Sequence, residues 1–193
     1  MKASIDTTAS ECLIGATSPS GRDPTVKAMN EGDRPNLEIR LATPDDVPAI
    51  AGLLRGLGWF TFINDEATAR TETRVKKHLR LCMADDSHTV LIAEEAKGAV
   101  LGYVAVHWLP YLMLPGPEGY VSELFVMETA RGVGVGTRLL EAVKDMAVSR
   151  GCSRLMLVNR KTRESYKRGF YRKLGWEERG EFANFVLHLP PKN

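Results

Sequence analysis

The stretch that decides the fold reads Leu124-Phe125-Val126-Met127-Glu128-Thr129-Ala130-Arg131-Gly132-Val133-Gly134-Val135-Gly136. It passes from a β-branched and aromatic strand into a glycine-spaced turn, and then into an amphipathic helix expected from Thr137 to about Arg150. The first N–H groups of a helix have no intrahelical acceptor and lie at the positive end of the macrodipole, so they bind anions. Glycines let the backbone approach such an anion closely. The segment therefore predicts a phosphate-binding turn.

Three kinds of glycine-rich phosphate site differ in their spacing, and the spacing separates them here. A Walker-type loop needs a lysine that reaches the terminal phosphates, and no lysine stands between Gly132 and Arg138. A dinucleotide fingerprint needs G-x-G-x-x-G early in the chain, whereas this stretch has G-x-G-x-G at a late position. The third pattern, Arg/Gln-x-x-Gly-x-Gly/Ala, is matched by Arg131, Gly134 and Gly136.

With this hexapeptide the sequence resembles the GNAT superfamily of acetyl-CoA-dependent N-acetyltransferases, and the resemblance covers about Leu37 to Leu189. The run Phe170-Tyr171-Arg172-Lys173-Leu174-Gly175-Trp176 is similar to the family block F-Y-x-K-L-G-F/W, in which the tyrosine faces the cofactor sulfur. The strand before the glycine turn resembles the family strand whose main chain pairs with the pantetheine arm. The resemblance implies acetyl-CoA as co-substrate, and it implies as cofactor-binding residues Leu124, Phe125, Val126, Arg131, Gly132, Val133, Gly134, Val135, Gly136, Thr137 and Asn159.

Asn159 belongs to this set because the chain departs from the family pattern. Relatives often carry an asparagine that bonds the pantetheine seven residues before the tyrosine, and Glu164 occupies that position here. Three readings stay open. Asn159 takes over the bond, the bond is absent, or Asn159 simply ends its strand.

The resemblance also implies which groups assist the reaction. The N–H of Val126 would receive the thioester carbonyl, and Tyr171 would give its proton to the departing thiolate, since a phenol has a pKa of about 10. Tyr171 is thus the candidate catalytic acid. Taken without the surrounding block, the pair Phe170-Tyr171 on a helix is typical of core.

The general base is harder to assign, because the usual glutamate positions of the family hold Ser122 and Tyr120, while the acidic residue is Glu123. Side chains alternate along a strand, so Glu123 is expected to face away from Ser122 unless a bulge intervenes. Glu123 is a candidate catalytic residue that acts through water or holds the amine, with a structural ion pair as the alternative. His107 is the fallback base, and the histidines have no mutual spacing that predicts a metal site.

The order of the elements predicts a mixed α/β fold with a mostly antiparallel central sheet flanked by helices, in the order βααββββαβαβ. Thr43-Pro44-Asp45-Asp46 predicts a helix start, since threonine is a capping residue and proline fits the first turn. The expected strands are Leu37–Leu41, Thr89–Glu94, Val100–His107, Tyr120–Met127, Arg154–Val158 and Asn184–Leu189. The later expected helices are Asp65–Met83, Thr137–Arg150 and Thr162–Leu174.

Length and charge indicate one domain, residues 37–193, after a weakly ordered extension, residues 1–36, that is rich in Ser, Thr, Gly and Asp. The formal net charge of +2 is small and spread out, so we expect no nucleic-acid partner. The densest basic cluster is either a solvated helix face or a means of attracting the coenzyme A phosphates. It comprises Arg160, Lys161, Arg163, Lys167, Arg168, Arg172 and Lys173.

The cellular setting follows from the cysteines and the hydropathy pattern. Cys12, Cys82 and Cys152 have no metal or redox spacing, which indicates free thiols in a reducing compartment. No apolar run approaches the roughly 20 residues that span a bilayer, and the amino terminus lacks a signal-peptide pattern. We therefore expect a cytoplasmic protein with no membrane partner.

Residues 56–62 and 108–117 are too aromatic and apolar for ordinary loops. Such segments mark ligand sites, pack on each other, or form a homodimer contact. We interpret the chain as an N-acetyltransferase that moves the acetyl group of acetyl-CoA to a primary amine of a small molecule in a ternary complex. The alternatives are a protein or peptide amine as acceptor, and a non-catalytic acyl-CoA sensor.

Overall fold

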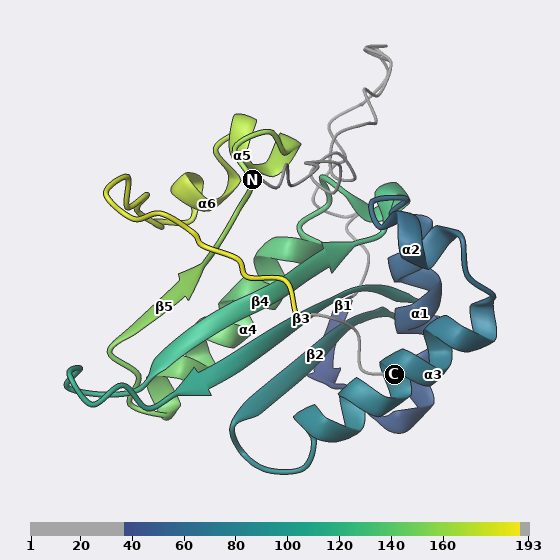
Figure 1. The fold of residues 1–193 in the computed structure, drawn as a ribbon, viewed down its shortest axis with the longest axis horizontal. Helices are drawn as coiled ribbons and strands as arrows, with labels where there is room; N and C mark the ends of the chain where they lie inside the picture. The colour runs from purple at the N-terminus through teal and green to yellow at the C-terminus, as the bar shows by residue number, and fades with distance from the viewer. Residues whose placement is uncertain (1–36, 190–193) are drawn as a thin grey trace, which may run out of the picture. The chain divides into compact units, whose positions relative to one another are not determined.

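The computed structural model describes residues 37–189, and the expected N-terminal extension lies outside them. Its centre is a five-stranded sheet in which the strands follow chain order, β1 to β5 (Figure 1). These strands are β1 Leu37–Leu41, β2 His88–Glu95, β3 Val100–Leu109, β4 Glu118–Val126 and β5 Arg154–Leu157. Neighbours from β1 to β4 are antiparallel, and β4 pairs with β5 in parallel. The predicted mixed, mostly antiparallel sheet is confirmed.

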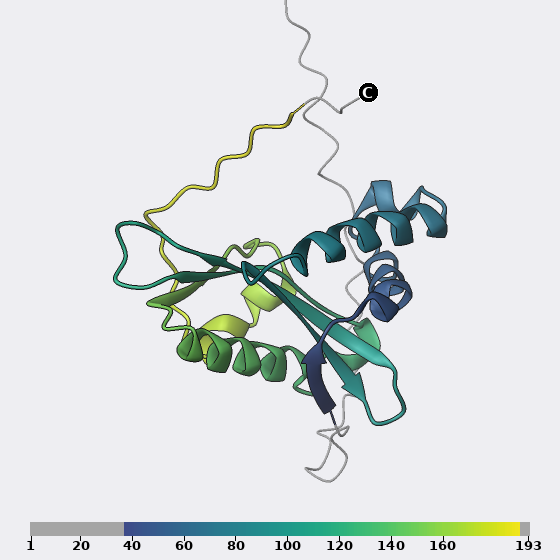
Figure 2. The same ribbon diagram turned by 90° about the horizontal axis from the view of Figure 1, so that it is seen from below.

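Helices cover both faces of this sheet (Figure 2). α1 (Val47–Gly56) and α3 (Thr68–Cys82) pack on one face, and α4 (Val135–Ser149) packs on the other. The shorter helices are η2 Pro44–Asp46, α2 Thr61–Asn64, η3 Glu128–Ala130, α5 Glu164–Lys167 and α6 Phe170–Lys173. No helix in the described part of the chain is long and apolar enough to cross a membrane.

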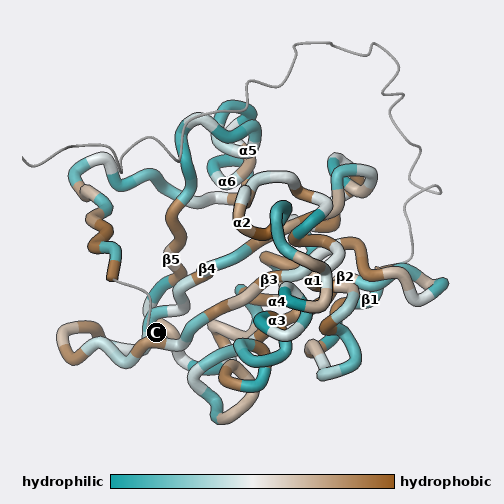
Figure 3. Tube along the Cα trace, turned by 45° about the vertical axis from the view of Figure 1, so that its right-hand side comes forward, coloured by the Kyte–Doolittle hydropathy of each residue, from teal (hydrophilic) through white to brown (hydrophobic). Residues whose placement is uncertain are grey.

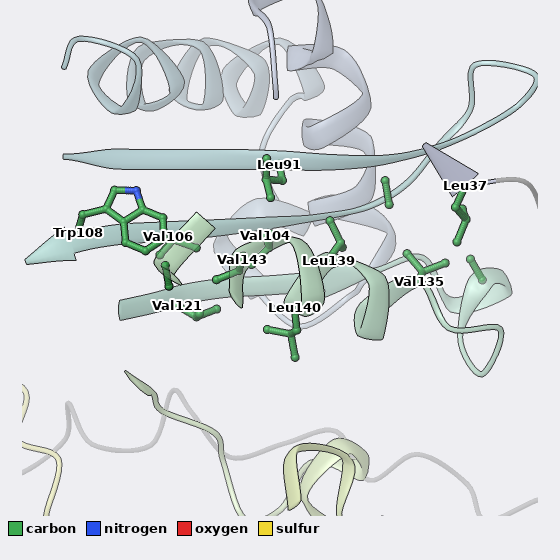
Figure 4. Close-up of a cluster of buried hydrophobic side chains, with 13 residues drawn as sticks. Leu37, Leu91, Val104, Val106, Trp108, Val121, Val135, Leu139, Leu140 and Val143 are labelled. Carbon is green, nitrogen blue, oxygen red and sulfur yellow. The ribbon is translucent and has the colours of Figure 1, made fainter. Parts of the chain in front are cut away.

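The core under α4 fixes the position of that helix. Alternate residues of β3, Val104 and Val106, face one apolar stripe of α4 that includes Leu139 and Val143, and all four side chains are fully buried (Figure 4). Burial of each such side chain stabilises the fold by roughly 1.5–3 kcal/mol. Because this stripe is held against the sheet, the N-terminal end of α4 lies beside the end of β4.

The helix start predicted at Thr43 is confirmed. Thr43 and Asp46 form a reciprocal capping box, in which the Thr43 N–H donates to the Asp46 carboxylate at 2.7 Å, and Pro44 occupies the first turn. Arg40 pairs with the same carboxylate at 2.7 Å, and this hydrogen bond holds the pKa of Asp46 below its ordinary value.

Several details of the expected element order are wrong. The expected order βααββββαβαβ has four strands between α3 and α4, whereas the structure has three, in agreement with the expected strand ranges. Helix α3 begins at Thr68 rather than Asp65. The helix expected over residues 162–174 is interrupted between α5 and α6, because Gly169 adopts a φ of 65°, outside the helical region. The strand expected at Asn184–Leu189 is not formed. Its alternating pattern suits a strand, but no neighbouring strand among the described residues supplies a hydrogen-bonded ladder.

The two apolar segments have different fates. Trp108 belongs to β3 rather than to a loop, and its buried indole donates to Thr89 Oγ1 at 2.9 Å. By contrast, Leu112 and Met113 in the β3–β4 loop are exposed, as are Phe185 and Leu187 near the C-terminus. Figure 3 shows the hydropathy of the chain along its trace. The N-terminal apolar segment, residues 56–62, packs beside the end of β4 and is described with the site.

Candidate active site

The sheet opens between β4 and β5. The two strands pair only from Glu118 to Val121 on β4, against Arg154–Leu157 on β5, and β4 then continues to Val126 (Figure 1). The second half of β4 is therefore paired with β3 alone among the described strands. A strand edge that is unpaired in this way offers its N–H and C=O groups to a ligand.

The hydrogen-bond pattern shows which groups face this opening. Met127 N–H donates to the Leu101 carbonyl at 2.8 Å, on the β3 side. In an antiparallel ladder, successive residues direct their N–H and C=O groups to opposite edges. Since Val126 lies opposite Gly102 in the register, its N–H and C=O point away from β3 and into the opening, and those of Leu124 do the same.

The glycine turn follows at once. Gly132 and Gly134 have φ values of 86° and 94°, which only glycine adopts without strain, and Gly134 caps α4. The first backbone bond of the helix runs from Arg138 N–H to the Gly134 carbonyl at 3.0 Å. The N–H groups of Val135, Gly136 and Thr137 thus belong to the first turn, which has no intrahelical acceptor for them. A Cβ added at Gly132 or Gly134 would meet no atom within 4 Å, so the turn is open.

Gly136 joins three of the predicted motifs in space. A Cβ placed on Gly136 would lie 3.3 Å from Phe170 Cζ and 3.7 Å from Val126 Cγ2. The first turn of α4, the end of β4 and helix α6 therefore meet at this residue. A larger side chain would push Phe170 away.

Tyr171 is the neighbour of Phe170 on α6. Its ring packs edge-on against Phe170, with centroids 5.0 Å apart, and against Trp176 at 6.1 Å. Burial raises the pKa of the Tyr171 hydroxyl, and the Arg168 guanidinium lowers it by less. The tyrosine therefore contributes to the core under α4 and also carries a hydroxyl that stays protonated at neutral pH.

A β-bulge changes the orientation expected for Glu123. The β3–β4 register shifts between Ala105 and Val106, so that Ala105 lies opposite Glu123 while Val106 lies opposite Val121. Ser122 is the extra residue, and the bulge places Ser122 and Glu123 on the same face of the sheet, the face of α1 and α3. The Tyr103 hydroxyl donates to Glu123 Oε2 at 2.6 Å, and burial together with this carboxylate raises the pKa of Tyr103 well above its ordinary value.

His107 lies on the same face, beside the bulge. Its Nε2 is 2.9 Å from Ser122 Oγ, and its ring contacts that of His88, with centroids 4.4 Å apart. Burial, and to a smaller extent His88, lowers the pKa of His107. The strand register places His88 directly opposite His107, a pairing that no local sequence pattern indicated.

Asn159 is engaged within the protein. Its side-chain amide exchanges hydrogen bonds with Ser165 Oγ on α5, at 3.2 and 3.3 Å. Glu164, at the family's asparagine position, is exposed and pairs with Lys167 at 2.9 Å. Among the described residues, Ser165 is the side chain that forms hydrogen bonds with the Asn159 amide.

The remaining predicted residues lie around the opening. Phe125 faces the α1 and α3 side, where Tyr103, Trp59 and Phe60 all pack edge-on against its ring. Arg131 lies before the glycine turn and pairs with the exposed Glu128 at 3.3 Å. Val133 packs on the core under α4. The structure thus brings the end of β4, the first turn of α4 and helix α6 together, and it places Trp59 of the apolar segment 56–62 against Phe125. It also adds Tyr103, which sequence reasoning missed because its contacts are long-range.

Within residues 37–189, no group of three or more His, Cys, Asp or Glu side chains is arranged to hold a metal ion. The polar groups at the site are instead a carboxylate, imidazoles, hydroxyls and free main-chain amides. Such groups suit proton transfer and the binding of an oxyanion.

Comparison with known proteins decides the family. Residues 56–176 match the model of the acetyltransferase (GNAT) family. The chain belongs to the GNAT family. A relative from Bacillus subtilis, named uncharacterized N-acetyltransferase YhfO, is 30% identical over 164 residues, which are 81% of this chain and 100% of that protein. This GNAT chain is an acetyl-CoA-dependent N-acetyltransferase.

One further relative matches over a shorter length, and a solved structure matches over most of the chain. The L-methionine sulfoximine/L-methionine sulfone acetyltransferase of Pseudomonas aeruginosa is 31% identical over 100 residues, 51% of this chain and 56% of that protein. Among solved structures, an aminoglycoside acetyltransferase from an uncultured soil metagenomic sample superposes with a TM-score of 0.64 at 17% identity, covering 80% of this chain and 97% of that one. At that identity the likeness supports the fold alone.

Proposed function

We propose that this GNAT chain transfers the acetyl group of acetyl-CoA to a primary amine of a small molecule, by direct attack in a ternary complex. The observation that carries the proposal is the opening between β4 and β5, into which the Val126 N–H points, beside the open glycine turn at the start of α4. The two parts fit the two ends of one ligand. The turn suits a pyrophosphate, and the strand edge suits an amide-containing arm.

Each end of the cofactor would be held by main chain. The amides of the turn and of the first helical residues, Gly132 to Thr137, would bind the pyrophosphate, since glycine leaves space for it. The N–H and C=O groups of Leu124 and Val126 would pair with the pantetheine arm as another strand would. Asn159 would form a hydrogen bond with the pantetheine arm only if its hydrogen bond with Ser165 were broken.

Groups on both faces of β4 would then assist the reaction by donating hydrogen bonds or transferring protons. Val126 N–H would donate to the carbonyl oxygen as negative charge develops there. As the amine nitrogen bonds to the carbonyl carbon and the carbon–sulfur bond breaks, Glu123 would take a proton from nitrogen through water, and the Tyr171 hydroxyl would give one to sulfur. Both side chains would return to their starting states by exchange with solvent.

Glu123 is the proposed base because the bulge turns it toward the face of α1 and α3, which would bind the acceptor amine, and Tyr103 holds it there. A second candidate is supported by its own geometry. His107 lies 2.9 Å from Ser122, which occupies one of the glutamate positions of the family, and its lowered pKa keeps the imidazole neutral at neutral pH.

A small-molecule acceptor is supported by the aromatic lining of this face and by the Pseudomonas aeruginosa relative, which is named for amino-acid analogues as substrates. The test is release of coenzyme A thiol from acetyl-CoA with polyamines, aminoglycosides, amino acids and short peptides. We expect one small-molecule class to accelerate release. Turnover with peptides alone would indicate a protein acceptor. Slow hydrolysis that no amine accelerates would contradict the proposal and favour a sensor.

A further inference from the structure

Trp59 contacts two arginines that come from distant parts of the chain. The guanidinium carbon of Arg163, at the start of α5, lies 3.7 Å from the centroid of the Trp59 ring. The guanidinium carbon of Arg131, before the glycine turn, lies 5.7 Å from the same ring. The face of a tryptophan attracts cations, so one indole holds two positive charges near each other.

Within the part of the chain that the structure describes, Arg163 contacts the Trp59 ring but forms no ion pair. Among residues 37–189, no carboxylate lies within ion-pair distance of Arg163. Other members of the basic cluster do have partners, since Lys161 and Arg172 bind Glu178 and Lys167 binds Glu164. The cluster is therefore not one uniform solvated face.

The electrostatic surroundings of Arg163 also favour the binding of an anion. Burial lowers the pKa of the Arg163 guanidinium, and the positive charges of Arg160 and Arg131 lower it further. Each of these effects disfavours the charged form, and each would be relieved by an anion. The carboxylate that pairs with Arg131 among residues 37–189 is that of the exposed Glu128, at 3.3 Å. An ion pair of that kind contributes little.

The location of this group relates it to the reaction. Arg131 is bonded to Gly132 of the glycine turn, and Trp59 packs edge-on against Phe125 of β4, with centroids 5.8 Å apart. Arg131 therefore adjoins the glycine turn, and Trp59 links both guanidinium groups to the end of β4. Guanidinium groups bind carboxylates and phosphates through paired hydrogen bonds.

We propose that Arg131, Trp59 and Arg163 form an oxyanion-binding site, in which Trp59 holds the two guanidinium groups and the ligand bridges them. The proposal rests on the proposed function, because it assigns the oxyanion to one of that reaction's own substrates. The oxyanion is a phosphate group of coenzyme A or the carboxylate of an amino-acid acceptor. Both present the same chemistry to the arginines, and the experiment distinguishes them.

The test compares Arg163→Gln with the wild-type chain. Calorimetric titration with coenzyme A and with inorganic pyrophosphate measures the phosphate arm. The KM values for L-methionine sulfone and for its amide measure the carboxylate arm. Loss of a charged hydrogen-bond donor weakens such binding by about tenfold. A tenfold rise in the Kd of coenzyme A identifies a phosphate, and a rise in KM for the acid but not for the amide identifies a carboxylate.

Arg150→Gln is the matched control. Arg150 also stacks on a tryptophan, with its guanidinium carbon 5.0 Å from the Trp108 ring, but it caps the C-terminal end of α4. The glycine turn lies at the other end of that helix, about 22 Å away. We expect the control to leave every one of these constants unchanged, and thermal unfolding checks that both variants are folded.

The results separate failure of the site from failure of the function. If the wild-type chain binds coenzyme A, and Arg163→Gln changes no Kd or KM, the oxyanion site is wrong while the proposed function stands. If the wild-type chain does not bind coenzyme A, the proposed function is wrong. In that case the titration with inorganic pyrophosphate is the test of the oxyanion site. Weaker pyrophosphate binding by Arg163→Gln than by the wild-type chain supports the site. Equal binding by the two chains, or no binding by either, overturns it.

Discussion

The two halves of β4 differ in what holds them. From Glu118 to Val121 the strand is paired with β3 on one edge and with β5 on the other, and Glu118 is fully buried. From Glu123 to Val126 it is paired with β3 alone among the described strands, and the side chains from Ser122 to Val126 are partly or largely exposed. One bulge, at Ser122, separates the two halves.

This difference shows how one strand serves both stability and function. The first half uses all its main-chain groups within the sheet, so it can contribute nothing to a ligand. The second half leaves alternate N–H and C=O groups free, and it ends beside the glycine turn. Changes in the second half should therefore affect binding and turnover, whereas changes in the first half should affect folding.

The largest expected effect is that of Gly134→Glu. The new side chain would bring a carboxylate to the position proposed for the pyrophosphate, and the φ of 94° would be strained for any residue except glycine. We expect calorimetric titration with acetyl-CoA to give no measurable binding. The control is Gly151→Glu, which adds the same charge at a φ of 66° at the other end of α4. Undiminished affinity in Gly134→Glu would refute the assignment of the turn.

Next comes Tyr171→Phe. The ring and its packing against Phe170 and Trp176 are kept, and only the proton donor is removed. General acid assistance contributes about 10²- to 10⁴-fold, so kcat should fall by about that factor while the Kd of acetyl-CoA changes little. The measurement is single-turnover kinetics, in which chemistry limits the rate. An unchanged rate there would leave Tyr171 with a packing role alone.

Glu123→Gln should have a smaller effect that depends on pH. If Glu123 is the base, the variant should lose most rate in acid, by about 10²-fold, because fewer amines are already deprotonated there, and alkaline pH should partly restore the rate. The measurement is the pH dependence of kcat/KM. His107→Gln is the comparison. Because burial lowers the pKa of His107, an imidazole base would stay active to lower pH than an ordinary histidine. If only His107→Gln removes the acidic limb, the role of base belongs to His107.

The smallest effect on turnover is expected from Arg154→Ala, in the fully paired half. Arg154 is the ion-pair partner of Glu118, whose Oε1 accepts no hydrogen bond from the described residues. Removing one partner of a buried pair costs about 3 kcal/mol, so the free energy of unfolding should fall by about that amount. Urea denaturation measures it. A large fall in kcat per folded molecule would show that the two halves of β4 are not independent.

Local chemistry explains what the sequence predicted well. The glycine turn, the capped helix start at Thr43 and the apolar stripe of α4 each depend on residues that are neighbours in the chain. Glycine at a positive φ, a capping side chain and a period of 3.6 residues act within one or two turns. The helix over residues 162–174 was predicted as continuous because its pattern does not reveal that Gly169 leaves the helical region.

The sequence by itself determined the family, the glycine turn and the order of most elements, because those features depend on short motifs of neighbouring residues. Only the tertiary structure decided which way Glu123 faces, since the bulge at Ser122 arises from pairing with β3. The same holds for the contacts of Trp59 with Arg131 and Arg163, which join residues far apart in the chain. The physical reason is that strand register and side-chain stacking depend on long-range neighbours, which no local pattern specifies.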